Sequence, residues 1–352
     1  MWISPTKQAN SQLLRAASFA CVCLLMLSPI KAADRVYPKD GVPATGKIQS
    51  LSPTKAVIAV RGKNQNYAMS DVLKIAFDGE PRELERARDL VIQQQYDQAL
   101  EEIKKIGAGA AKSKAVKEDV QFYRWYCEGK LALTGAGDRA AAIKGLRALA
   151  ATNRNTHHLF DVGEMLGELH LSIGKPTEAS SFFSVMLKAT DDVTKAKGVF
   201  QLGMVELSQK KDDEARKRFT QLSGAASSSA EMKRLQNLSK VGIAICDQRA
   251  GKAEEALKRL DNLVAATESS DQQLYARISN AKGACYAALN KPTEALFHYL
   301  QTDLLFFGEA DAHAEALYHL KALWTQYGNP TKAAEAGRQL ATQYATSSWA
   351  QL

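Results

Sequence analysis

The six residues GKPTEA at positions 174–179 recur almost unchanged as NKPTEA at 290–295 and as GNPTKA at 328–333. In each copy a residue suited to a turn precedes a proline, and an alanine closes the motif. Proline is favoured in the first turn of a helix, and glycine is favoured just past the end of one. Each copy therefore predicts the same local structure, in which one helix ends, the chain turns and a second helix begins.

Weaker copies of this turn end at four other alanines, and the seven alanines are separated by 43, 37, 36, 41, 39 and 38 residues. A self-similar period in this range is typical of a stack of paired helices. The spacing predicts a mostly α protein, with an α-solenoid of about seven helix pairs over residues 81–352. The seven alanines are Ala99, Ala142, Ala179, Ala215, Ala256, Ala295 and Ala333.

Small and large residues stand at fixed distances from four of these alanines. A glycine or alanine lies twelve residues upstream, and a large residue lies four residues downstream. Two antiparallel helices cross closely only where neither carries a bulky side chain, and a large residue one turn later fills the space beside the crossing. The small residues are Gly167, Gly203, Ala244 and Gly283, and the large ones are Phe183, Phe219, Leu260 and Tyr299.

With these positions, residues 84–345 resemble tetratricopeptide-repeat proteins of the secreted bacterial type. The match includes the loop glycines Gly174, Gly251 and Gly328. The chain departs from the family in having a longer repeat period and in lacking a tryptophan near the start of each first helix. The resemblance implies a curved array whose first helices line a concave groove that binds a peptide or protein, without a cofactor and without enzymatic activity.

The family's groove positions, carried over to this chain, imply a partner-binding groove that is acidic at one end, apolar in the middle and mixed at the other. Only Arg277 and Asn280 are of the type that clamps a C-terminal carboxylate, so a chaperone-tail clamp is not expected. The alternative is that these residues form ordinary solvated helix faces. The implied groove residues are Asp161, Glu164, Glu168, Lys197, Phe200, Met204, Arg277, Asn280, Glu315 and Tyr318.

Residues 34–80 have a different texture from the rest of the chain. Short β-prone runs, which include 45–51, 55–60, 66–69 and 73–77, are separated by turn residues. Five short strands in so few residues predict a small all-β, barrel-like module, which resembles Sm-like or SH3-like modules. A module of this size buries little by itself, so we expect it to dock on the first helices.

Positions 1–33 have the pattern of a cleaved signal peptide. Lys7 and Arg15 precede an apolar run over 16–27, which is shorter than the roughly 20 residues that span a bilayer, and a small pair, Ala32-Ala33, follows. The pattern predicts export to the periplasm or beyond. Lipidation at Cys21 or Cys23 is an alternative for which the flanking residues fit poorly.

The remaining composition excludes several classes of protein. The chain carries 46 Lys and Arg against 38 Asp and Glu, and three of the cations precede the expected cleavage site, so a mature chain has a charge of +5. Positive and negative residues alternate, without the basic stripe of a nucleic-acid binder. The mature chain keeps three widely spaced cysteines, which predicts buried apolar side chains and no disulfide framework.

Two other functions stay open as alternatives to a binding scaffold of the cell envelope. A metal-dependent enzyme would use the helix face of His157, Asp161, Glu164 and Glu168, but these residues extend over three turns, so they are too spread out for one ion. The segment 344–350, with its aromatic residues, suggests either a cap on the array or self-association, as in a homo-oligomeric envelope protein.

Overall fold

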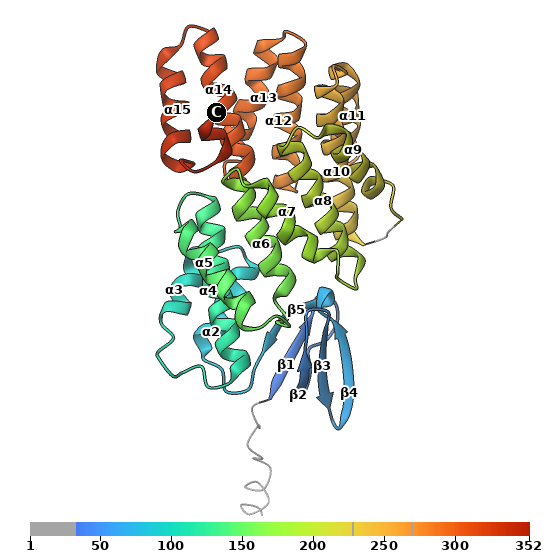
Figure 1. Cartoon of the computed structure of the whole chain (residues 1–352), viewed down its shortest axis with the longest axis vertical. Helices are drawn as coiled ribbons and strands as arrows, with labels where there is room; N and C mark the ends of the chain where they lie inside the picture. The colour runs from blue at the N-terminus through green and yellow to red at the C-terminus, as the bar shows by residue number, and fades with distance from the viewer. Residues whose placement is uncertain (1–32, 227–228, 269) are drawn as a thin grey trace, which may run out of the picture.

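A computed structural model describes residues 33–226, 229–268 and 270–352. These residues form a five-stranded antiparallel sheet followed by 14 helices (Figure 1). The expected signal peptide, with Cys21 and Cys23, lies outside the described residues apart from its last position. Within the described ranges, none of the helices is both long enough and apolar enough to cross a membrane.

The sheet has the strand order β4-β3-β2-β1-β5. Arg61 and Gly62 have φ of 50° and 79° and join β3 to β4 in a two-residue hairpin turn. Residues 63 and 64 already pair within β4, so this strand begins three residues before the expected run at 66–69. The strands are β1 (Asp34–Pro38), β2 (Ala44–Leu51), β3 (Lys55–Val60), β4 (Lys63–Ala68) and β5 (Val72–Ala76), with a 3-10 turn (Met69–Asp71) before the last.

The predicted five-stranded all-β module is present, but its sheet is open, so the expected barrel shape was wrong. Its edge strands β4 and β5 pair with β3 and β1, not with each other. The apolar face of the sheet, which includes Val36 and Ile58, shares one core with Leu84 and Ala87 of the first helix and Val116 of the third. Because these helices cover the apolar face, the sheet has no need to close on itself. The expected docking of the module on the first helices is confirmed.

The 14 helices form seven antiparallel pairs, as predicted, and the two helices of each pair pack against each other. The first and second helices of the pairs are α2 (Arg82–Ile92) and α3 (Tyr96–Lys104), α4 (Lys114–Leu133) and α5 (Arg139–Thr152), α6 (Leu159–Ser172) and α7 (Pro176–Met186), α8 (Asp192–Ser208) and α9 (Asp212–Ser223), α10 (Ala230–Arg249) and α11 (Ala253–Ala265), α12 (Gln272–Ala288) and α13 (Pro292–Leu305), and α14 (Ala310–Gln326) and α15 (Pro330–Gln343).

The seven alanines occupy one structural position. Each is the fourth residue of the second helix in its pair, and each is buried. The predicted small-to-large contact is also present: a Cβ added to Gly167 would lie 2.3 Å from the ring of Phe183, and one added to Gly203 would lie 2.6 Å from Phe219. The rings thus rest directly on the backbone of the first helix, which is why these positions are glycines.

The helices wind so that the end of the array returns to its early pairs. The Gln343 side chain lies 3.5 Å from the Thr134 carbonyl oxygen in the turn between α4 and α5, and Figure 1 shows α15 above α5. The first helices of consecutive pairs contact one another in the order α4, α6, α8, α10, α12 and α14. These helices therefore form the inner face, and the second helices form the outer one. The cysteines Cys127, Cys246 and Cys285 are buried free thiols, as expected.

Candidate functional site on the inner face of the helix array

The predicted groove residues lie on α6, α8, α12 and α14, all of which are inner helices. Asp191 and Asp271 fix the starts of α8 and α12, because each carboxylate accepts a hydrogen bond from a backbone N–H in the first turn. The carboxylate oxygens lie 2.7 Å from the Thr194 nitrogen and 3.1 Å from the Leu274 nitrogen.

Opposite charges pair across neighbouring inner helices. Lys130 Nζ lies 2.9 Å from Glu168 on α6, and Lys197 on α8 lies 3.9 Å from both Glu164 and Glu231. Further along, Arg277 lies 3.7 Å from Asp311. The end of the groove that was predicted to be acidic therefore contains a row of ion pairs. In this row Glu164 and Glu168 each face a lysine of a neighbouring helix.

Burial and the neighbouring charges shift the pKa values of three of these side chains. Glu164 raises the pKa of Lys197 above its usual value, and burial opposes that shift. Burial raises the pKa of the Glu164 carboxyl, although Lys197 works against it. For Lys130, burial disfavours the charged form, but the nearby Glu168 carboxylate outweighs it and raises the pKa.

Two predicted groove residues are buried and so support the inner face without lining it. Phe200 is 4% exposed and packs against the ring of Phe219. Asn280 is 1% exposed, and its amide donates to the Ala312 carbonyl oxygen at 2.8 Å and to Glu315 Oε2 at 2.9 Å. The middle of the predicted groove therefore has less apolar surface than expected.

Glu315, Met204 and Tyr318 are partly exposed. Burial raises the pKa of Glu315 to about 7, even though its hydrogen bond from Asn280 favours the carboxylate. Met204 Sδ lies 3.8 Å from Arg277 Nη1. Tyr318 packs against Trp349 of the C-terminal turn, so this segment caps the last pair, which is one of its two expected roles.

A cavity of about 280 Å³ lies where the inner face meets the sheet. Its sheet side carries Leu73 and Lys74 of β5, and its helix side carries the predicted groove residues Asp161 and Lys197. Four aromatic side chains add apolar surface: Phe122, Tyr123, Tyr126 and Phe160. The cavity therefore offers both signs of charge beside flat apolar surfaces.

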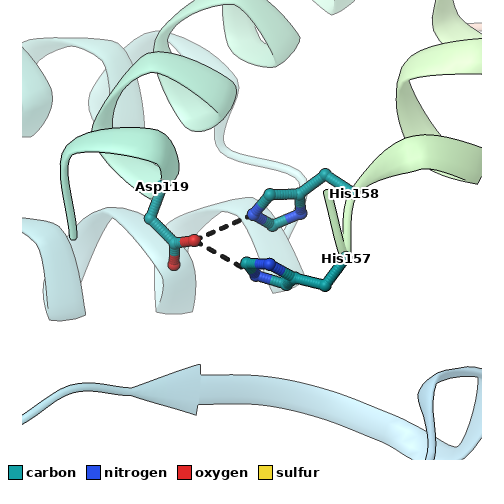
Figure 2. Close-up of side chains that lie close together, drawn as sticks. All are labelled: Asp119, His157 and His158. Atoms are coloured by element: carbon teal, nitrogen blue, oxygen red, sulfur yellow. Dashed lines mark hydrogen bonds and ion pairs between the residues drawn. The ribbon is translucent and has the colours of Figure 1, made fainter. Parts of the chain in front are cut away.

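A buried cluster of Asp119, His157 and His158 also borders this cavity (Figure 2). Asp119 projects from α4, and the two histidines precede α6, where His158 is the N-cap residue. Asp119 Oδ1 lies 2.9 Å from His158 Nε2 and 3.2 Å from His157 Nε2.

Arg88 on α2 completes this cluster from the other side. Its Nε and Nη2 donate to Asp119 Oδ2 at 3.1 and 2.7 Å, while Nη1 and Nη2 donate to Glu80 at 2.6 and 2.8 Å. Burial alone would raise the pKa of Asp119, but the charge of Arg88 and the contacts with both histidines hold it well below its usual range. Burial and the neighbouring His157 lower the pKa of His158.

The four residues that the sequence offered as an alternative metal site do not converge on one point. His157 turns toward Asp119, whereas Asp161 is exposed on α6 and Glu164 and Glu168 pair with lysines. Asp119, His158 and Arg88 were missed by the sequence reasoning. The available signals were the His157-His158 pair itself and two charged residues at positions of α2 and α4 that face the core.

Comparisons with known proteins agree with the helix pairing. A scan of protein-family models and a search of curated proteins found no match. The structure of a tetratricopeptide repeat protein from Parabacteroides merdae is similar, with a TM-score of 0.50 and 13% identity over 74% of this chain and 92% of that one. A Rap protein complexed with competence and sporulation factor has a TM-score of 0.49 and 16% identity over 76% of each chain. Pseudomonas aeruginosa PilF has a TM-score of 0.38 and 16% identity over 67% of this chain and 97% of its own.

The sequence identity to the first of these structures is 13%, so that similarity concerns the fold alone. The match to the first structure extends over most of that protein's length. The recurring alanine position, the seven antiparallel pairs and this similarity give one conclusion: the helical part of the chain has the tetratricopeptide-repeat fold.

Proposed function

We propose that this protein is a non-enzymatic scaffold that holds a peptide or protein segment on the inner face of its helix array. The single observation that carries the proposal is the cavity between β5 and the inner helices. Asp161 and Lys197 of the inner face line it together with residues of the sheet. A segment with alternating charged and apolar side chains fits the lysines, carboxylates and aromatic rings that line it.

Crosslinking in cells tests this proposal. A photo-reactive residue at exposed Asp161 is expected to capture a defined partner, and the same residue at exposed Lys258 on the outer helix α11 serves as the control. Both positions face solvent on helices of the same array, so background capture is matched. Identical products from the two positions would refute binding at the inner face.

A charge reversal separates the cavity from the rest of the surface. Asp161→Arg is expected to weaken capture of the partner at a second inner position, Tyr318, whereas Lys258→Glu leaves it unchanged. Asp161 is exposed, so the reversal alters the cavity's charge with little effect on folding. Equal capture in both variants would argue against a role for the cavity.

We further propose that the scaffold acts outside the cytoplasm, in the bacterial envelope. The support is the basic start, short apolar run and small residues over positions 1–33. Cell fractionation and the intact mass of the purified protein test this. Export predicts an N-terminus near residue 33 or 34, and a full-length cytoplasmic chain would contradict it.

A further inference from the structure

Three possible metal ligands converge at the edge of the cavity. One ligand atom each from Asp119, His157 and His158 lie within 4.8 Å of one another, and Asp119 Oδ1 lies 2.9 Å from His158 Nε2 and 3.2 Å from His157 Nε2. With bond lengths of about 2.0–2.1 Å, ligand atoms around a tetrahedral zinc ion lie roughly 3.3 Å apart. The two separations from Asp119 Oδ1 are therefore close to the spacing of ligand atoms in such a site.

The surrounding residues hold the three ligands in this orientation. Arg88 occupies Asp119 Oδ2, which leaves Oδ1 directed at the two imidazoles, as Figure 2 shows for the three ligands. The ring of Phe122 stacks on His158 with a centroid distance of 3.7 Å and an interplanar angle of 7°. Partners of this kind, which fix the coordinating side chains, are typical of metal sites in proteins.

The charge of the cluster favours a dication. Glu80, Glu118 and Asp119 bring three carboxylates to a region where Arg88 supplies one positive charge, and all four side chains are at most 10% exposed. With neutral histidines two negative charges are left over. Burying unbalanced charge is costly, and a bound divalent cation would remove the imbalance.

We propose that Asp119, His157 and His158 bind one divalent transition-metal ion of the zinc class. The ion replaces the hydrogen bonds between Asp119 Oδ1 and the imidazoles, so each neutral imidazole binds it through a deprotonated Nε2 and carries its proton on Nδ1. The adjoining cavity gives it a path from solvent and room for a water ligand. Bound there, the ion links α4 to the start of α6 beside the docked sheet. This proposal does not depend on the identity of a protein partner.

Metal titration of the mature chain, purified without a histidine tag and stripped with a chelator, tests the site. We expect one Zn²⁺ per chain by calorimetry and, with Co²⁺ as the probe, visible absorption bands of a low-coordinate ion. His157→Ala and His158→Ala are each expected to weaken Zn²⁺ binding by at least about 100-fold. His298→Ala is the matched control, because His298 is a half-buried histidine on α13, remote from the cluster in the chain.

The wild-type chain alone keeps the proposal falsifiable if a variant fails to fold. Absence of Zn²⁺ binding up to about 100 µM, which corresponds to a very weak site, or Co²⁺ spectra that match those of the ion in buffer, would overturn it. Equal Zn²⁺ affinity in the wild type and the two cluster variants would overturn it as well. Because a ligand that binds only the folded state stabilises it, added Zn²⁺ should also raise the Tm of the wild type and of His298→Ala.

Discussion

The junction between the sheet and the first helices is held together differently from the later part of the helix array. Where the sheet meets α2 and α4, the contact contains a buried ionic cluster in which Arg88 bridges Glu80 and Asp119. In three pairs between α6 and α13 the two helices of the pair meet through apolar packing, in which the rings of Phe183, Phe219 and Tyr299 lie against glycines of the first helix.

This difference affects both stability and function. Apolar packing between repeats depends on shape, and it loses stability in steps as atoms are added or removed. A buried ionic cluster stabilises the fold only when it is complete. Removing one member leaves the charges of the others uncompensated in a region shielded from solvent. The cluster also borders the cavity, so the junction that holds the sheet to the array lies beside the candidate binding site.

The largest expected effect is loss of Arg88. In Arg88→Ala, Asp119 and Glu80 lose their buried counter-charge, and we expect the free energy of unfolding to fall by about 3–5 kcal/mol. Urea denaturation in the presence of a chelator measures the change without any contribution from metal.

Arg86→Ala is the control for this change. Arg86 lies on the same helix with its side chain 68% exposed, so we expect a change within about 0.5 kcal/mol. If the two variants unfold at the same urea concentration, the buried cluster contributes nothing specific to the junction.

A methyl group tests the apolar contacts. Gly167→Ala would place a Cβ 2.3 Å from the Phe183 ring, and we expect a loss of about 1–3 kcal/mol despite the better helix propensity of alanine. Gly163→Ala on the same helix is the control, because its nearest neighbour is 3.4 Å away, and we expect it to be neutral or to stabilise by up to about 1 kcal/mol. Thermal unfolding of both variants gives the comparison. Equal Tm values would show that the packing of the Phe183 ring does not require close approach to the backbone at position 167.

The apolar contacts were predictable from sequence because they repeat. The alanine position, the upstream glycine and the downstream ring recur at fixed distances, and the structure places them together as expected. The open sheet was not predictable in the same way. Whether five strands close depends on what covers their apolar face, and the helices that cover it come later in the chain.

The candidate site shows the same limit. The fold resemblance placed Asp161 and Lys197 on the inner face, where both line the cavity. It could not show that Asn280 is buried or that His157 turns toward Asp119, since each contact joins residues on different helix pairs. A single sequence carries no signal for such distant pairs when their side chains are not part of the repeat.

The pH dependence of stability extends the comparison to the last inner helices. Burial raises the pKa of Glu315 from 4.5 to about 7, so the folded state keeps its proton over a range in which the unfolded chain has released it. Stability from this group is therefore present at low pH and is lost as pH rises from about 4.5 to 7. Glu315→Gln keeps an acceptor for Asn280 and should remove this loss, on the order of 1 kcal/mol. Urea midpoints at pH 5 and pH 8 measure it, with exposed Glu335→Gln as the control; equal pH dependence in the wild type and Glu315→Gln would contradict it.

The smallest expected effect concerns the turns between paired helices, which are shared by both regions. Gly251 and Lys210 occupy the same place in their pairs, five residues before the buried alanine, and both have positive φ, 81° and 58°. A side chain in this conformation is strained, so Lys210→Gly should stabilise the protein by about 0.5–1 kcal/mol. Gly251→Ala should destabilise it by a similar amount, and because a Cβ there would have no neighbour within 4 Å, the cost can come only from the backbone. Opposite shifts of Tm in the two variants would show that one turn conformation is imposed on the array by its pairing, whatever residue stands there, whereas shifts of the same sign would mean that the turns adapt to their own sequence.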